Sequence, residues 1–463
     1  MRVSFLIALL FSAACAGSYA KKIKATEESF YSGDVDGAVA SITPLAQDSS
    51  SRDRLLFYME AGVVYHTKGD YQTSIDIFRR ADEMAEEIKT SITDSTKAFL
   101  LSDREAAFQG ENFERILIKY YLALNQVMLG DLENTKRTLR KLEADLKDMK
   151  YEDSAYKQIL AARYLDALVS EELRAYNDAR VQYKNLEIFG ADHAWVAGER
   201  YALAERSGDA GDKAKNAAHR QRPLDIKPAV AGEKGNGELV LLVQSGKAAV
   251  KASRGNLMND REFAVALRIA IDVAIITHGK GLSTAGVIAM MGTAENPIAK
   301  FTPREAEAEP ALLLDETPLP APYHLTNFDL IAEKNFNENY SSYINKNVAS
   351  IATKIVIAAV AADAIAQQLR KKDNGIVGAL GGLAVGLGAG GAVAATVKPD
   401  LRSWHMLPAR FSALRVTLPA GSYQLKIAAD DPNRIVFGLD GQAVEIKPGK
   451  KTFVSLRSFR RGL

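Results

Sequence analysis

The chain has 463 residues, which is too long for one ordinary hydrophobic core and predicts two or three domains. It contains 59 Lys and Arg against 57 Asp and Glu, a formal net charge of +2, and no basic stripe with interleaved aromatic residues. This balance argues against a nucleic-acid-binding protein.

The first 20 residues are typical of an export signal. Arg2 supplies the positive start, residues 3–11 are apolar apart from Ser4, and small residues follow. The apolar run is too short to cross a membrane as an ordinary helix. We therefore predict that the chain is exported to the cell envelope.

The only cysteine, Cys15, follows residues 12–14 (Ser-Ala-Ala) in a sequence similar to the lipobox of bacterial lipoproteins, although Ser12 stands where Leu is commonest. This pattern predicts lipidation of Cys15. Ala16, rather than Asp, follows the cysteine and favours an outer-membrane lipoprotein that faces the periplasm. The alternative is a soluble periplasmic protein cut after Ala20. With no second cysteine, no disulfide forms within the chain.

Residues 21–205 have the pattern of a helical repeat. The best copy matches the tetratricopeptide consensus in order and spacing, with Tyr58, Ala61, Gly62, Tyr65, Gly69, Asp70, Tyr71, Ser74, Phe78 and Ala81. The small Ala61 and Gly62 allow two helices to approach closely. Tyr65 and Phe78 then fill the groove between them, and Gly69 supplies the turn.

Three weaker copies share this register, and four stacked copies exceed the minimum of three that an array needs for stability. Their matching residues are Gly33, Asp34, Ala38, Ile42 and Leu45; Ala123, Gly130, Asp131, Leu139 and Leu142; and Ala167, Tyr176, Ala179 and Tyr183. Residues 90–110 interrupt the array, which predicts an irregularity there.

A stacked helical array offers a concave groove in which a peptide or a helix of another protein can lie. Phe108, Asn112, Arg115 and Tyr120 are candidates for the lining of that groove. The alternative is that the repeat only supports the rest of the chain.

Residues 206–236 are rich in Lys, Asp, Gly and Ala and predict a mobile linker. After it, apolar runs at 238–245 and 248–253 around Gly246 indicate a β-hairpin. Residues 262–274 predict a third strand, with a helix as the alternative.

Residues 326–372 follow the three- and four-residue spacing of a long helix, and the sequence from 375 to 397 carries no charge. Four glycines there recur at every fourth residue: Gly378, Gly382, Gly386 and Gly390. Each costs about 1 kcal/mol of helix propensity against Ala, so a closely packed partner helix is needed. We predict a helical hairpin over 326–397, either buried in a soluble domain or forming a membrane or oligomer contact.

From residue 411 onward, short apolar runs bounded by Gly, Pro or Asp predict a β-module over 411–463 that resembles a small antiparallel β-sandwich. Residues 237–463 would then form one α+β unit behind the amino-terminal α-solenoid. The predicted fold class is α+β, with several domains.

Three further stretches are similar to a family of bacterial envelope lipoproteins that carry tetratricopeptide repeats. They are Glu114 to Asp131 (ERILIKYYLALNQVMLGD), Gly237 to Arg254 (GELVLLVQSGKAAVKASR) and Asp400 to Gly421 (DLRSWHMLPARFSALRVTLPAG). The resemblance implies export, lipidation and a repeat followed by a β-region. It implies no activity, because the family has no established catalytic residues.

No pattern of catalytic or metal-binding residues stands out. The six His have no metal-type spacing, so we predict no metal, no cofactor and no small-molecule substrate. The most site-like group is Asp400, Arg402, Trp404 and His405. A structural role is favoured, in which Asp400 pairs with Arg402 and Trp404 anchors the hairpin to the β-module.

These observations together predict an exported lipoprotein that is not an enzyme. It would bind other envelope proteins through the repeat groove, as an adaptor or scaffold, while the lipid holds it at the membrane. The alternative is an oligomeric or membrane-inserting structural subunit that uses the glycines between 378 and 390.

Overall fold

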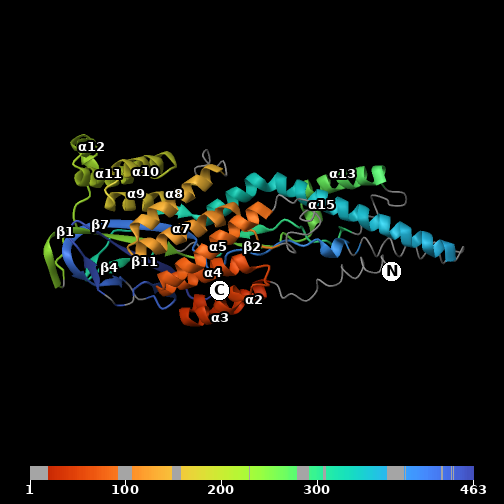
Figure 1. Cartoon of the computed structure of the whole chain (residues 1–463), viewed down its shortest axis with the longest axis horizontal. Coiled ribbons are helices and arrows are strands. Elements are labelled where there is room, and N and C mark those ends of the chain that lie inside the picture. The colour runs from red at the N-terminus through yellow and green to blue at the C-terminus, as the bar shows by residue number, and fades with distance from the viewer. Residues whose placement is uncertain are drawn as a thin grey trace.

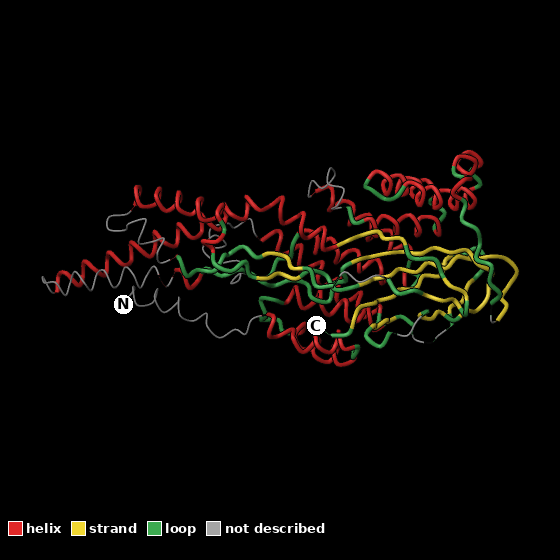
Figure 2. Tube along the Cα trace, turned by 180° about the vertical axis from the view of Figure 1, so that it is seen from behind, coloured by secondary structure: helices red, strands yellow, loops and turns green. Residues whose placement is uncertain are grey.

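In the computed structural model, a layer of helices lies across one face of a β-sheet, and two long helices project from one end of this body (Figures 1 and 2). We call the helical layer with its sheet the body and the projecting helices the arm. The structure describes residues 19–91, 107–148, 158–228, 230–278, 291–305, 309–372, 391, 393–428, 431–439, 441 and 443–462.

The helical layer consists of helix pairs, and a short turn joins the two helices within each pair. Its helices are α2 (Tyr19–Ser32), α3 (Val35–Gln47), α4 (Arg54–Lys68), α5 (Tyr71–Ser91), α7 (Asn112–Met128), α8 (Leu132–Asp148), α9 (Leu160–Glu172), α10 (Tyr176–Ile188) and α11 (His193–Ser207). Helices α2 and α3, α4 and α5, α7 and α8, and α9 and α10 pack as pairs. This is a tetratricopeptide-like solenoid.

A Gly-Asp dipeptide makes three of the turns between paired helices. Gly33, Gly69 and Gly130 have positive φ angles of 95°, 86° and 75°, which glycine adopts without strain. The Asp that follows caps the next helix: the Asp70 side chain accepts from the backbone N–H of Thr73 at 3.1 Å. In each of these turns the Gly therefore ends one helix and the Asp begins the next.

Close packing within the second pair depends on Gly62. A Cβ atom at this position would lie 2.4 Å from Cζ of Phe78, which is far inside van der Waals contact. The backbone carbonyl of Gly62 also accepts a hydrogen bond from Ser74 Oγ at 2.7 Å. Of the other packing residues predicted for the repeat, Gly69 and Gly130 are exposed in their turns and Tyr65 is half-buried. The rest are fully buried: Ala61, Phe78, Ala81, Ala123, Ala167 and Ala179.

The main sheet has six strands and is mixed. It is formed by β1 (Val230–Ser245), β6 (Tyr323–Asn327), β7 (Arg410–Tyr423), β9 (Arg434–Phe437), β10 (Val444–Ile446) and β11 (Lys451–Arg460), in the order β10-β7-β1-β11-β9 with β6 also on β7. The central strand β1 is antiparallel to β7 and parallel to β11.

The two faces of this sheet belong to different cores. Side chains of Val240, Leu242 and Phe411 pack with the repeat helices. The alternate residues, including Leu241 and Leu414, pack in a second core. A small sheet covers that second face with β4 (Leu312–Leu314), β5 (Thr317–Pro318) and β8 (Leu425–Ile427). Burial on both faces explains the unbroken apolar run at the centre of β1.

The arm is formed by α13 (Arg261–His278) and α15 (Phe328–Lys372). Helix α15 begins inside the body, where the Phe328 ring meets that of Phe411 edge-on at 5.1 Å. The two helices share a separate core that includes Phe263, Leu267 and Ile271 of α13 and Ile344, Val348, Ile351 and Ile355 of α15. The remaining short elements are β2 (Val250–Ala252), β3 (Lys300–Thr302), α12 (Ala210–Lys215), η2 (Ala217–His219) and η3 (Leu257–Asn259).

The organisation differs from the sequence prediction at the linker. Residues 206–236 contain helix α12 and the start of β1 at Val230. Between them, the N–H of Leu224 donates to the Thr417 carbonyl at 2.7 Å, and Ile226 is buried in the second core. This segment therefore docks on the sheet, and the helical and β-regions form one core instead of separate units.

Three β predictions are also corrected. No hairpin forms around Gly246, because β1 pairs with β7 and β11 while β2 pairs with β3. Residues 262–274 lie in helix α13, the alternative for that segment. Residues 411–463 are not a self-contained antiparallel sandwich, because β7 and β11 both pair with β1 and one of these pairings is parallel. Cys15 and the four glycines from Gly378 to Gly390 lie outside the described residues.

Candidate functional site: the inner face of the helical repeat

The candidate site is the side of the repeat formed by α4, α7 and α9, the first helices of their pairs. We call this side the inner face. In Figures 1 and 2 the strands of the main sheet run across it. Almost every residue of the three helices is buried, charged and polar residues included. The groove predicted from the sequence is therefore filled by the chain's own sheet.

At one end of the inner face lies a buried charge cluster, which we define as Arg415, Lys451, Glu171, Glu199 and Glu238. The guanidinium of Arg415 lies 2.9 Å from Glu171, 2.9 Å from Glu199 and 2.7 Å from Glu238. Lys451 Nζ lies 2.6 Å from Glu171 and 2.9 Å from Glu238. Two cations of the sheet thus hold three carboxylates, two from the repeat and one from β1.

Burial and attraction compete in this cluster. Burial acts to raise the pKa of Glu238, but Arg415 and Lys451 hold it far below its ordinary value. At Glu199 burial prevails and raises the pKa, although Arg415 opposes it. Removing one partner would leave uncompensated charge inside the protein, which typically costs about 3–5 kcal/mol.

A neutral polar network occupies the centre of the inner face. His66 Nδ1 lies 2.8 Å from Asn125 Oδ1, and His66 Nε2 lies 3.0 Å from Ser455 Oγ and 2.8 Å from Gln244 Nε2. Asn125 uses its NH₂ group as a donor to Ser74 at 2.9 Å, so its Oδ1 accepts from His66. The proton therefore sits on Nδ1, and burial lowers the pKa of His66 to about 4.

The four residues singled out near position 400 are built into the same contact region. Arg402 binds Asp400 at 2.7 Å and also Asp53, at the start of α4, at 3.0 Å. Trp404 is buried, with ring centroids 5.7 Å from Tyr121 and 6.2 Å from Phe78. It therefore anchors the chain to the repeat helices, which corrects the predicted contact between hairpin and β-module.

His405 is also held by the repeat. Its Nδ1 lies 3.0 Å from Glu27 Oε2, and the next backbone N–H, of Met406, donates to Glu60 at 2.9 Å. Attraction by His405 and Arg304 lowers the pKa of Glu27, although burial opposes the shift. These contacts join the segment that precedes β7 to helices α2 and α4 of the repeat.

The predicted groove residues do not line an open groove. Tyr120 is buried, with its ring 4.8 Å from that of Phe411 on β7. Phe108 is buried under the guanidinium of Arg402, 5.5 Å away. Arg115 donates to Asn112 on the same helix.

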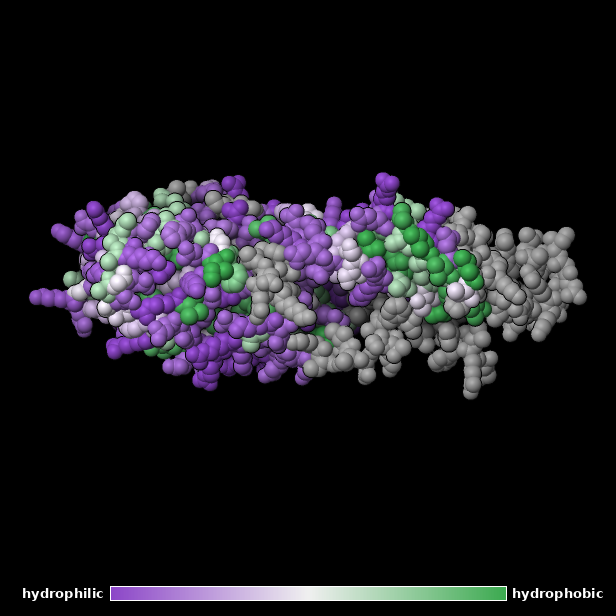
Figure 3. Space-filling view, turned by 90° about the horizontal axis from the view of Figure 1, so that it is seen from above, coloured by the Kyte–Doolittle hydropathy of each residue, from purple (hydrophilic) through white to green (hydrophobic). Residues whose placement is uncertain are grey.

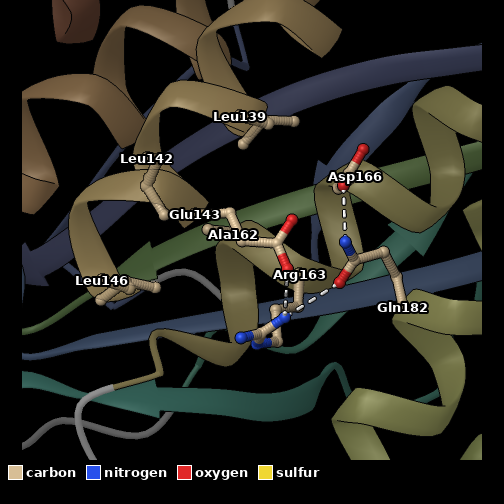
Figure 4. A pocket seen from close by; sticks show the side chains of 8 residues that line it. All are labelled: Leu139, Leu142, Glu143, Leu146, Ala162, Arg163, Asp166 and Gln182. Atoms are coloured by element: carbon tan, nitrogen blue, oxygen red, sulfur yellow. Dashed lines mark hydrogen bonds and ion pairs between the residues drawn. The ribbon is translucent and has the colours of Figure 1, made fainter. Parts of the chain in front are cut away.

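A small cavity lies between α8, α9 and α10 (Figure 4). It is lined by Leu139, Leu142, Glu143, Leu146, Ala162, Arg163, Asp166 and Gln182, and its volume is about 10 Å³. Gln182 Nε2 donates to Asp166 at 2.8 Å across its wall. A space of this size holds about one water molecule, so it is no binding site for a substrate.

The part of the chain that the structure describes contains neither a candidate metal site nor a helix that could cross a membrane. No group of three or more His, Cys, Asp or Glu side chains in this part of the chain is placed to hold a metal ion. Within the same residues, none of the helices has the length and apolar character needed to span a bilayer.

The chain was compared with known proteins. No model of a known protein family matches it, and no curated protein matches it. Among solved structures, the MamA protein is similar over 43% of this chain and 88% of its own, with 12% identity and a TM-score of 0.31. A tetratricopeptide repeat protein from Parabacteroides merdae is similar over 44% and 81%, with 12% identity and a TM-score of 0.22.

The Rap conjugation gene regulator of plasmid pLS20, solved in complex with the Phr* peptide, is similar over 43% of this chain and 50% of its own. The identity is 14% and the TM-score is 0.27. Each of these similarities covers less than half of this chain.

Proposed function

We propose that this protein is a non-enzymatic scaffold of a bacterial envelope assembly, in which the repeat and the sheet form one rigid body. Other proteins contact the outer surfaces of that body, and the inner face serves to hold the sheet. The observation that carries the proposal is the filled inner face, with its charge cluster shared between repeat and sheet.

A peptide could enter the inner face only by displacing the sheet. Arg415 and Lys451 would then lose their carboxylate partners, and His66 would lose Ser455 and Gln244. Leaving several buried polar groups unpaired costs more than a short peptide contact returns. The inner face therefore fits the alternative interpretation, in which the repeat supports the rest of the chain, better than it fits a peptide-binding groove.

The outer side of the repeat is the surface that supports protein binding. Its second helices expose charged residues together with single apolar ones, such as Val181 and Ile188 on α10, which are 55% and 59% exposed. Solenoids present extended surfaces of this kind to partners. Export and lipidation at Cys15 remain part of this proposal and place the scaffold at a membrane.

Site-specific photo-crosslinking in cells tests the proposal with the full chain. A photoreactive residue would replace Val181 on the outer side or the buried Tyr121 on the inner face, in otherwise identical proteins. We expect crosslinks to another envelope protein from outer positions on α5, α8 and α10 and none from position 121. A partner captured from position 121, or none from the whole outer series, would contradict the scaffold.

Lipidation has its own test. Labelled palmitate should be incorporated into the chain and lost in Cys15→Ser, with fractionation to the outer membrane lost as well. An unlabelled protein with signal cleavage after Ala20 would support the soluble periplasmic alternative instead.

A further inference from the structure

The arm carries a row of exposed aliphatic side chains that nothing in the described chain covers. On α13, Val265, Ile269, Val273 and Ile276 are 53%, 59%, 55% and 83% exposed. Their spacing of four, four and three residues places them on one side of the helix. We call these four residues the aliphatic stripe. Figure 3 shows hydrophobic side chains gathered over the arm on this side of the molecule.

The aliphatic stripe and the arm's own core lie on different sides of α13. Phe263, Leu267 and Ile271 on the other side of α13 are buried against α15. Helix α13 therefore has apolar side chains on two sides, and among the described residues only one of these sides packs against another helix. A helix that is apolar on its free side as well is typical of a docking surface.

The exposed surface of α15 changes character along the arm. Near the body its exposed residues are mostly polar, although Leu330 is 41% exposed; the polar ones include Glu333, Lys334, Asn337, Glu338, Ser341, Ser342, Asn345 and Lys346. Farther out, Ile357 and Val360 are 47% and 58% exposed. Asp260, just before α13, bonds Tyr340 of α15, so α13 starts at that level and its stripe reaches the apolar part.

We propose that this outer part of the arm docks on a phospholipid bilayer, with the aliphatic stripe inserted at the boundary between headgroups and acyl chains. Arg268, exposed beside the stripe, would keep its guanidinium among the headgroups. The inference goes beyond the proposed scaffold, because it concerns a lipid surface and not a protein partner.

Three observations favour a bilayer over a second copy of the chain. The stripe offers on the order of 400 Å² of exposed surface, about half of the roughly 800 Å² per partner of a standard protein interface. The chain next to α13 and α15 adds long uncharged sequences at 281–294 and 374–397. Tyr19, four residues after the predicted lipidation site Cys15, packs on the body, with its ring 5.4 Å from that of His405.

Vesicle flotation tests the inference. The chain without its predicted signal, and therefore without an acyl group, is mixed with vesicles of phosphatidylethanolamine and phosphatidylglycerol. We expect flotation of this protein and a loss of roughly tenfold or more in the stripe variant with Val265, Ile269, Val273 and Ile276 all changed to Ser. The matched control, with Val181→Ser and Ile188→Ser on α10, should float like the wild type.

A second readout reports the position of the stripe. Without its signal the chain has no cysteine, so Ile276→Cys and Ile188→Cys can each carry one environment-sensitive dye. Vesicles should shift the emission at position 276 to the blue and leave position 188 unchanged. A blue emission at 276 without vesicles would show that the chain covers its own stripe, and would overturn the proposal.

Two other outcomes would also overturn it. Equal flotation of the stripe variant and the wild type would place any lipid contact elsewhere. A dimer in analytical ultracentrifugation that the stripe variant converts to a monomer, without vesicle binding, would assign the stripe to a second copy. Circular dichroism of each variant verifies that the helices are retained.

Discussion

The body and the arm differ in how completely they bury their side chains. In the body, charged groups such as Arg415 and apolar ones such as Val240 are enclosed between repeat and sheet. In the arm, Ile271 is enclosed while Ile269, two residues earlier on the same helix, is 59% exposed. The body meets its burial and pairing requirements within the chain, whereas the arm leaves an apolar surface for something outside it.

The largest expected effect concerns the charge cluster of the body. Arg415→Met would leave Glu171, Glu199 and Glu238 buried around Lys451 alone, and should lower the free energy of unfolding by about 3–5 kcal/mol. Lys426→Met breaks an ion pair in which both side chains are largely exposed and should change it by less than about 1 kcal/mol. Urea unfolding of both variants measures the difference; equal losses would mean that the cluster is open to solvent.

The next effect separates the two sides of α13. Ile271→Ala removes a fully buried side chain from the core of the arm and should cost about 2–4 kcal/mol. Ile269→Ala, on the stripe, should stay within about 0.5 kcal/mol in the absence of lipid. If the two substitutions cost the same in thermal unfolding, the stripe is covered and the contrast with the body disappears.

The close contact between α4 and α5 can be tested by adding one methyl group at Gly62. Gly62→Ala would place a carbon 2.4 Å from the Phe78 ring, and we expect a loss of about 1–3 kcal/mol as that ring shifts. Gly211→Ala on α12 meets no atom closer than 3.4 Å and serves as the control, with a small gain from helix propensity. Stability of Gly62→Ala equal to that of the wild type would argue against the tight first-to-second helix contact.

The smallest effect is a gain at the surface of the body. The turn after α9 has Arg174, with φ 58°, where the other turns have glycine. A side chain in the left-handed region is strained, so Arg174→Gly should raise the free energy of unfolding by about 0.5–1 kcal/mol. A loss on this substitution would mean that the Arg174 side chain makes a contact worth more than the strain.

The local parts of this fold were predictable from the sequence. The turn at Gly69 and Asp70 and the close helix contact at Gly62 could be predicted, because both depend on residues within about 20 positions of one another. The long helix from 328 to 372 was predicted for the same reason. The short apolar runs from residue 411 onward likewise predicted strands, and β7, β9 and β11 lie there.

The pairing of distant segments was not predictable in this way. Strand β1 pairs with β11, more than 200 residues later, and no local pattern encodes that choice. Arg415, inside the apolar run from Phe411 to Leu418, was the available signal, since a charged residue on the inward side of a strand requires a buried partner. Its partners Glu171 and Glu199 could be assigned only once the repeat and the sheet were seen in contact.

The most direct test of the filled inner face is the titration of His66 by NMR, with His66→Gln identifying its signal. The structure predicts a pKa of about 4, below the ordinary 6.5, because the ring is buried, and the hydrogen bond to Asn125 opposes this shift only in part. A lowered folded-state pKa means that this stabilising contribution is complete above pH ~6.5 and is lost as the pH falls toward about 4. A ring that titrates near 6.5 in the folded protein would show a water-filled groove and contradict the account.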